Sequence, residues 1–400
     1  MSFGIYIFYI NLSFIYSFIE GLGQNWEAIK LENGNFLICS VNGLYTLDPT
    51  FQILNYTNEF IIVGNYFTII KKFTKEDGSY ILIISTFISY ILNSEGNLLY
   101  IINDFSFVKK LEYSVIPYNH SGDAFNYYII HFNSGQMILN KNSYYSNNGT
   151  LEKKDFNFNN TYELYNNSIT CQLMTYSNEN VISCFFPTEI NNEYFINCIV
   201  FKAEENFEII KTSELKIESI HSDSIKSEVM PTDDRKKVLI VFLNYYGDCL
   251  CYAWYDININ NFTYGYLVMD AFPKTLGNSF YNDISYFKET EEFIISFFYR
   301  NISYNSTEYH NVYLIYSIDK NFEYSFFGIL SNFMLGNSFC QNTPFIISED
   351  KPSYFLYKIF FSSVAQKYCI ILNLNSSEII SLFIINKEIK IINPIKLYML

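Results

Sequence analysis

Residues 276–280 read Leu-Gly-Asn-Ser-Phe, and the same pentapeptide returns 59 positions later at residues 335–339. Each copy is followed by a polar turn and then by a pair of runs rich in apolar, β-branched and aromatic residues. Duplication at a spacing of this size is typical of solenoids, propellers and other repeat architectures. The repeat is therefore the first feature that a fold for this chain has to explain.

The repeat extends along the whole chain as a series of strong apolar runs. Consecutive runs begin 45, 46, 54, 57, 55 and 61 residues apart. Turn-forming residues precede most of them, as in Asn33-Gly34-Asn35, because Gly and Asn tolerate positive φ and Asp bonds its own backbone. The runs open at Phe36, Ile81, Tyr127, Val181, Val238, Phe293 and Tyr354.

Each unit contains further runs after the first. In the fourth unit, Val181–Phe186 is followed by Tyr194–Phe201 and then by Glu205-Asn206-Phe207, a polar turn with one aromatic residue. Short paired runs dominated by Ile, Val, Phe, Tyr and Thr favour hairpins of pleated sheet over helix. Each unit is thus expected to supply roughly three to four strands in meander order.

Strands that repeat at a pitch of about 50 residues match the four-stranded blade of a β-propeller. We predict an all-β protein, a β-propeller of seven four-stranded blades, with each apolar run as the inner or second strand of its blade. The alternatives are another repetitive all-β fold, such as a solenoid or tandem β-sandwiches, which would need less regular spacing. The chain lacks the Trp-Asp, kelch-glycine and Asp-box signatures of known blade types.

The N-terminal segment, residues 1–23, is predicted to be a signal peptide or a signal anchor, which leaves residues 24–400 as a single propeller-like domain. Gly21-Leu22-Gly23 offers a small-x-small cleavage site, although the usual basic residue before the apolar region is missing. The competing interpretation is a first β-strand of the propeller. No other segment has the length and apolarity of a membrane span.

Two residue patterns agree with secretion. The eight cysteines are an even number, which permits up to four disulfides in a secreted chain, although buried thiols are the alternative. Sequons are abundant, although a chain rich in asparagine also produces them by chance. The candidate glycosylation sites are Asn55, Asn119, Asn148, Asn159, Asn166, Asn261, Asn301, Asn305 and Asn375.

The spacing of the cysteines suggests specific pairs. Cys184 and Cys198 are expected to be near neighbours across a hairpin centred on Ile190-Asn191. Cys171 competes for Cys184 through a turn at Asn178-Glu179, with a slip that a bulge would absorb. A recurrent staple is suggested by two pairs of nearly equal spacing, Cys171 with Cys198 and Cys340 with Cys369.

Composition excludes several functions. The net charge is −14 and the only arginines are Arg235 and Arg300, which argues against nucleic acid and anionic membranes as partners. A sialidase-like propeller enzyme would need three arginines for its carboxylate-binding cluster, so the two arginines of this chain argue against that class of enzyme. The 37 tyrosines and 39 phenylalanines either stack on sugars or anchor a partner, or they reflect the aromatic preference of β-sheet, which we favour.

Patterns that carry chemistry are scarce. Cys249-Leu250-Cys251 lacks the usual spacing of a zinc ligand pair. Residues 256–260 alternate oxygen ligands as calcium loops do, but the central glycine is missing, which favours a strand-end turn. We predict no catalytic, cofactor-binding or metal-binding residues. The four histidines are scattered: His120, His131, His221 and His310.

The expected function is that of a secreted or cell-surface, non-enzymatic protein that binds a protein or a glycan through the loop faces of its propeller. The first alternative is an extracellular propeller hydrolase that acts on glycans with paired carboxylates, which would gather at the central channel. The second is an intracellular scaffold, which would keep its thiols reduced.

Overall fold

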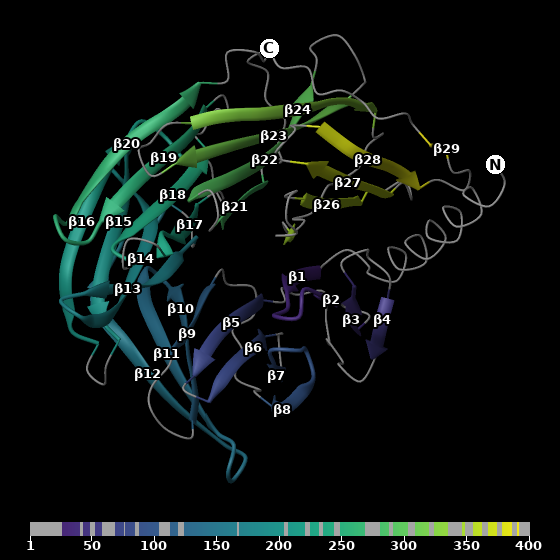
Figure 1. Ribbon diagram of the computed structural model, residues 1–400. Coiled ribbons are helices and arrows are strands. Elements are labelled where there is room, and N and C mark those ends of the chain that lie inside the picture. Colours follow the sequence, from purple (N-terminus) through teal and green to yellow (C-terminus); the bar gives the residue numbers. More distant parts are fainter. Residues whose placement is uncertain are drawn as a thin grey trace. The chain divides into compact units, whose positions relative to one another are not determined.

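The computed structural model describes residues 26–40, 43–48, 53–57, 69–75, 77–84, 88–103, 113–118, 124–165, 168–203, 207–220, 225–231, 235–243, 249–268, 281–287, 291–302, 309–319, 324–334, 346–348, 355–361, 367–373, 378–385 and 390–391. These residues form 29 β-strands (Figure 1). Within the same ranges, no helix has the length and apolarity to cross a membrane. The predicted signal segment, residues 1–23, lies outside the described residues.

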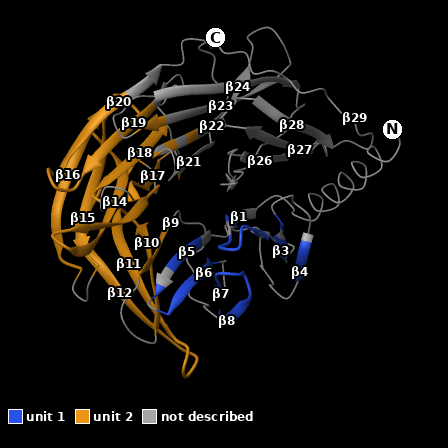
Figure 2. Ribbon diagram, in the orientation of Figure 1, with its two compact units in different colours: residues 1–110, 335–400 blue, residues 111–334 orange. Residues whose placement is uncertain are grey.

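The chain separates into two compact units (Figure 2). Unit 1 combines residues 1–110 with residues 335–400, and unit 2 is the continuous stretch 111–334. Every sheet is an antiparallel meander in which strands pair in chain order. The single domain over residues 24–400 stays a prediction.

Unit 2 contains four sheets of four strands each. Their strands are β9 (Tyr113–Tyr118), β10 (Ala124–Asn133), β11 (Gln136–Tyr145) and β12 (Thr150–Thr161); β13 (Thr170–Tyr176), β14 (Glu179–Ile190), β15 (Glu193–Lys202) and β16 (Ile209–Ile217); β17 (Lys226–Val229), β18 (Lys237–Leu243), β19 (Cys249–Asp256) and β20 (Asn261–Val268); and β21 (Tyr281–Phe287), β22 (Glu292–Ile302), β23 (Tyr309–Asp319) and β24 (Tyr324–Met334).

Unit 1 contains three sheets, two from the beginning of the chain and one from its end. Their strands are β1 (Trp26–Lys30), β2 (Phe36–Ser40), β3 (Gly43–Leu47) and β4 (Ile53–Thr57); β5 (Ile69–Lys75), β6 (Gly78–Ile84), β7 (Ile88–Asn93) and β8 (Leu98–Asn103); and β25 (Ile346–Ser348), β26 (Phe355–Phe361), β27 (Lys367–Asn373), β28 (Glu378–Ile385) and β29 (Lys390–Ile391).

Neighbouring sheets within each unit meet through their first strands. In unit 2, β13 contacts β9 and β17, and β17 contacts β21. In unit 1, β1 contacts β5 on one side and β25 on the other, so the last sheet of the chain lies beside the first. Consecutive meanders that adjoin through their first strands are the blades of a β-propeller. The predicted all-β propeller fold is confirmed, whereas a ring of seven blades stays a prediction.

The predicted apolar runs lie in the second strand of each sheet. These strands are β2, β6, β10, β14, β18, β22 and β26, as the repeat predicts. The last begins at Phe355, since Tyr354 lies outside the described residues. A second strand has a sheet neighbour on each side, and this position suits a run without polar interruption.

Strand β14 shows how the second strands are buried. Residues 181–188 are buried without interruption. Ile182 and Phe186 face the apolar layer shared with the sheet of β9–β12. Val181 and Phe185 face the layer shared with the sheet of β17–β20. The sheet of β13–β16 therefore lies between two cores, and both of its faces are apolar.

Aromatic rings fill these layers. The rings of Phe132 and Phe186 meet edge to face with centroids 4.8 Å apart. In the next layer the rings of Phe185 and Tyr255 meet in the same way at 5.5 Å. Edge-to-face pairs contribute about 0.5–1.5 kcal/mol beyond their buried area. The aromatic residues at these positions serve the core, which supports the structural interpretation of the tyrosine and phenylalanine excess.

Three hairpins of unit 2 close through two-residue turns with positive φ at both positions. These are Ser134-Gly135 (51° and 80°), Ser177-Asn178 (50° and 64°) and Asn191-Asn192 (53° and 63°). Such turns match the right-handed twist of paired strands. The turn residues therefore determine which residues of the two strands lie opposite each other.

Gly135 is expected to tolerate no side chain. A Cβ there would lie 2.6 Å from the carbonyl oxygen of Tyr162, whereas a Cβ at Gly149 would meet nothing closer than Tyr144 Oη at 4.0 Å. Both glycines have positive φ, so alanine costs each about 1 kcal/mol. Gly135→Ala should lose a further ~1–3 kcal/mol of unfolding free energy in urea titrations, because backbone must move. Equal losses at both positions would contradict this.

Candidate functional site

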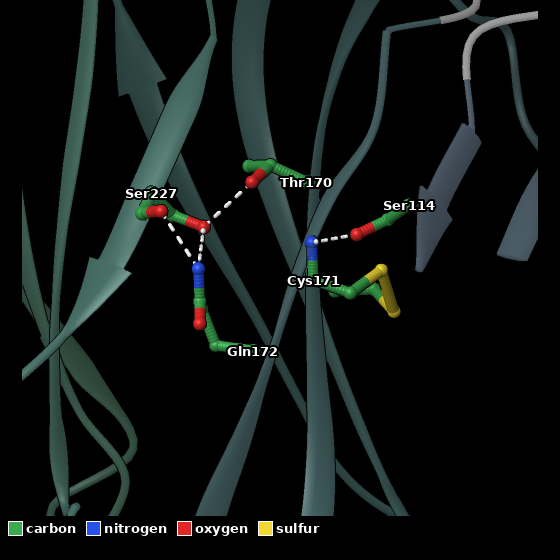
Figure 3. Close-up of a disulfide and its surroundings, with 6 residues drawn as sticks. Ser114, Thr170, Cys171, Gln172 and Ser227 are labelled. Carbon is green, nitrogen blue, oxygen red and sulfur yellow. Dashed lines mark hydrogen bonds between the residues drawn. A yellow bond between two sulfur atoms is a disulfide. The ribbon is translucent and has the colours of Figure 1, made fainter. Parts of the chain in front are cut away.

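A row of polar contacts joins the first strands of three neighbouring sheets in unit 2 (Figure 3). We call this row the inner seam, and its residues are Ser114 on β9, Thr170, Cys171 and Gln172 on β13, and Ser227 on β17. The backbone amide of Cys171 donates to Ser114 Oγ at 3.0 Å. The hydroxyls of Thr170 and Ser227 share a hydrogen bond of 2.7 Å.

Gln172 completes the inner seam. Its Nε2 donates to the backbone oxygen of Ser227 at 2.7 Å and to Ser227 Oγ at 3.2 Å. The first strands of adjacent sheets form no ladder with each other, and these contacts supply hydrogen bonds between the sheets at this edge. All groups of the seam are neutral hydroxyls and amides, which suits cohesion between blades and supplies no acid or base.

Ser183 lies directly opposite Gln172 on the neighbouring strand β14. Its side chain is fully buried, and its Oγ makes no hydrogen bond with the described residues. A buried hydroxyl without a partner costs about 1–3 kcal/mol. Ser183 and Ser227 therefore form a contrasting pair, because the first hydroxyl lacks the partners that the second has.

Carboxylates are sparse on the same strands. Glu228 is the single carboxylate on β9, β13 and β17. Burial lowers the pKa of Arg235, and the charge of Glu228 opposes this shift. The next first strand, β21, carries Asp283, so the first strands of unit 2 hold two carboxylates on different sheets. The described part of the chain contains no group of three or more His, Cys, Asp or Glu residues that could hold a metal ion.

A disulfide joins Cys171 to Cys184 beside the inner seam (Figure 3). The two residues lie directly opposite each other on β13 and β14, with Cα atoms 4.1 Å apart. The expected pairing of Cys184 with Cys198 is wrong, since Cys198 lies opposite Phe185. Cys198 is instead a buried thiol in the layer toward the sheet of β17–β20.

The correction comes from the turns. The hairpin between β14 and β15 turns at Asn191-Asn192, one residue later than the expected Ile190-Asn191. With a two-residue turn at either position, Cys184 lies opposite residue 197 or residue 199, so Cys198 points to the other face of the sheet in both cases. The preceding hairpin turns at Ser177-Asn178, one residue before the predicted centre, and the pairing with Cys171 then needs no bulge.

The expected staple between Cys171 and Cys198 is wrong, because Cys171 is bonded to Cys184. Its expected counterpart, between Cys340 and Cys369, stays a prediction. Cys340 lies outside the described residues. Cys369 lies on β27, opposite Ile359 of β26 and Phe383 of β28.

The turn between β19 and β20, residues 257–260, is tied to the neighbouring sheet, and we call it the anchored turn. Lys211 of β16 donates from Nζ to the backbone oxygens of Ile257 at 2.6 Å and Asn258 at 3.5 Å. The same ammonium lies 4.0 Å from the ring centroid of Tyr176. A cation that satisfies carbonyl oxygens and lies over an aromatic ring holds its turn firmly.

Asn260 supplies the second attachment of the anchored turn. Its Nδ2 donates to the backbone oxygen of Thr212 at 3.0 Å, and its own backbone oxygen accepts from Ser213 Oγ at 3.3 Å. Its Oδ1 accepts from Tyr255 Oη at 2.8 Å. Ile259 remains 68% exposed at the tip. The turn thus presents an apolar side chain on a fixed backbone.

The calcium-loop pattern of residues 256–260 is a strand-end turn, as predicted. The Asp256 carboxylate accepts from the Asn258 backbone amide at 2.8 Å. The Asn260 side chain is taken by the contacts with Thr212 and Tyr255. The side-chain oxygens of Asp256 and Asn260 therefore accept hydrogen bonds from the protein's own groups, a backbone amide and the Tyr255 hydroxyl.

The remaining predicted residues are dispersed. His131 is buried on β10, where burial lowers its pKa and the charge of Asp155 opposes the shift. His310 lies on β23, and His120 and His221 lie outside the described residues. Among the sequons, Asn55, Asn148 and Asn261 are exposed. Asn159 and Asn301 lie on strands; Asn119, Asn166, Asn305 and Asn375 lie outside the described residues.

Comparisons with known proteins found similar structures but no similar family or curated sequence. No family model matches the chain, and no curated protein matches it. The WD40 domain of SCAP from fission yeast aligns over 92% of this chain and 88% of its own, with 12% identity and a TM-score of 0.45. The Dos1 propeller aligns over 94% and 86%, with 10% identity and a TM-score of 0.45. A six-bladed lectin of Aleuria aurantia aligns over 82% and 96%, with 9% identity and a TM-score of 0.41.

Replacement by alanine is expected to affect stability differently at Ser227, within the inner seam, and at Ser183, beside it. Ser227→Ala removes the hydroxyl that bonds Thr170 and Gln172, and should lower the free energy of unfolding by ~1–2 kcal/mol. Ser183→Ala removes a buried hydroxyl that lacks a partner among the described residues, and should cost nothing or stabilise the fold. Urea unfolding compares the two variants, and a larger loss for Ser183→Ala would contradict the assignment.

Peptide mapping without reduction is expected to recover Cys171 linked to Cys184. Cys198 is 1% exposed, and burial raises its pKa, so it should react with an alkylating reagent only after unfolding. The disulfide spans a sequence separation of 13 residues. Closing a loop of this size contributes about 3 kcal/mol, which reduction should remove. Alkylation of both Cys171 and Cys184 in unreduced, denatured protein would exclude the bond.

Proposed function

We propose that this chain is a secreted or cell-surface, non-enzymatic propeller that binds another protein through the loop end of unit 2. The loop end comprises the turns that follow the first and third strands of the β13–β16 and β17–β20 sheets. These turns emerge at one end because antiparallel strands alternate in direction. In unit 2 they include Ser177-Asn178 and the anchored turn.

Backbone contacts support an ordered loop end. Thr175 donates its amide to the carbonyl of Arg235 at 3.2 Å, and Ile257 donates its amide to the carbonyl of Lys236 at 3.1 Å. Arg235 and Lys236, just before β18, therefore bond to the end of β13 in the preceding sheet and to the anchored turn of their own sheet. Binding to a surface that is already ordered costs less conformational entropy than binding to a mobile loop.

Ile259 carries the proposal. It is the most exposed of the large hydrophobic side chains described, and the anchored turn holds its backbone by side-chain contacts from the neighbouring sheet. An exposed aliphatic side chain keeps apolar surface in contact with water. Removing that surface from water, when a partner covers it, contributes favourably to the free energy of binding. An apolar tip of this kind favours a protein partner over a hydroxyl-rich glycan.

The Cys171–Cys184 disulfide supports the proposed location. Disulfides persist in secreted proteins and in the lumen of the secretory pathway, and they are rare in the reducing cytosol.

Photo-cross-linking tests the binding surface in cells that express the full chain. A photoreactive amino acid replaces Ile259 in one variant and Ile190, which is 42% exposed at the β14–β15 turn, in the matched control. We expect a discrete protein adduct from position 259 and none from position 190. Adducts of equal yield from both positions would overturn the assignment of this surface.

A second measurement separates the alternatives. Binding of the purified chain to arrayed glycans, with unchanged affinity in Ile259→Ser, would point to a glycan and away from the loop end proposed here. Release of reducing ends from polysaccharides would overturn the non-enzymatic assignment.

A further inference from the structure

We propose that Asn148 carries an N-linked glycan, an inference that rests on the luminal location proposed above. Asn148-Gly149-Thr150 is a sequon at the turn between β11 and β12, residues 146–149. Residues 147–150 are all exposed. The sequon therefore lies at a hairpin tip, where an approaching enzyme meets the fewest neighbouring groups.

The Asn148 side chain is held in one orientation. Its Oδ1 accepts from the backbone amide of Thr150 at 3.0 Å and from Thr150 Oγ1 at 2.7 Å. A side-chain amide nitrogen cannot accept a hydrogen bond, so the atom that accepts from Thr150 is Oδ1, and Nδ2 takes no part in these contacts. Nδ2 makes no hydrogen bond with the described residues. The nitrogen that receives a glycan is thus unpaired with described residues, on a side chain that is exposed.

The Thr150 hydroxyl contributes directly to this geometry. A sequon requires Ser or Thr two positions after the asparagine, and here that hydroxyl already contacts the acceptor amide. The hairpin supports the turn, since Gly149 donates its amide to the carbonyl of Tyr145 at 2.9 Å with a φ of 68°. Positive φ is accessible to glycine without steric cost, so the residue between the two functional positions suits the turn.

The other described sequons lie on strands. Asn55 on β4 is paired with Thr46, and Asn301 on β22 is paired with His310. Asn261 begins β20 opposite Asp256, and its Oδ1 accepts from the adjacent Phe262 amide at 2.8 Å and not from Thr263. Asn159 lies on β12. A backbone held in a ladder is harder to fit into an enzyme's groove than a turn.

The group transfer balances as follows. The Asn148 Nδ2 forms a bond to the anomeric carbon of an oligosaccharide carried on a lipid diphosphate. The bond between that carbon and the diphosphate oxygen breaks, and its electron pair leaves with the diphosphate. One Nδ2 proton passes to a base of the transferring enzyme. No oxidant or reductant is needed.

Mass spectrometry of the full chain expressed in eukaryotic cells tests the proposal. Enzymatic deglycosylation in ¹⁸O-labelled water converts a glycosylated asparagine to labelled aspartate, and we expect the label at Asn148. Asn148→Gln and Thr150→Ala should each remove one glycan step in gel mobility. Asn147→Gln is the matched control, because it changes the neighbouring exposed asparagine and leaves the sequon intact. Thr150→Ser keeps the hydroxyl and should retain the glycan.

The outcomes distinguish this inference from the proposed function. An unlabelled Asn148 in a chain that has the Cys171–Cys184 bond and glycans at other sequons would overturn the inference alone. A chain without glycans and without the disulfide would overturn the luminal location and the glycan with it.

Discussion

A four-stranded meander cannot bury two apolar faces by itself, and the rest of this structure depends on that constraint. In the sheet of β13–β16, Ile182 and Phe186 leave one face apolar while Val181 and Phe185 leave the other apolar. Each face is buried only when another sheet covers it. The inner seam and the anchored turn lie at opposite edges of these layers, where hydrogen bonds replace apolar contact between neighbouring sheets.

Periodicity predicted the architecture because the second strand of each sheet is the most apolar, and a run such as that of β14 is visible in sequence. The register of single hairpins was less accessible. Asn191-Asn192 and Ile190-Asn191 are both acceptable turn centres, and a two-residue turn at either one places Cys198 and Cys184 on opposite faces of the sheet. The inner seam has no sequence signature, because serine, threonine and glutamine are common residues. Their side chains form these hydrogen bonds only when the first strands of different sheets lie side by side.

Similar polar contacts hold the inner seam and the anchored turn, but the anchored turn also exposes an apolar side chain. Thr170, Gln172 and Ser227 direct their polar groups at one another, and the disulfide beside them crosslinks two strands that already pair. The anchored turn fixes its backbone in a similar manner but leaves Ile259 uncovered. Residue type alone does not reveal this difference, because isoleucine is a common residue of the buried core and is nevertheless exposed at position 259.

The contact of β1 with β25 affects the order in which the protein matures during translation. Unit 2 is continuous over residues 111–334, so all of its sheets can form while the ribosome is still reading the message. Unit 1 begins with the earliest strands, yet β1 acquires its neighbour β25 only after residue 346 has emerged. At synthesis rates of about 5–20 residues per second, the first sheet waits on the order of ten seconds or more with one side uncovered. This places the demand for chaperone protection on the N-terminal blades.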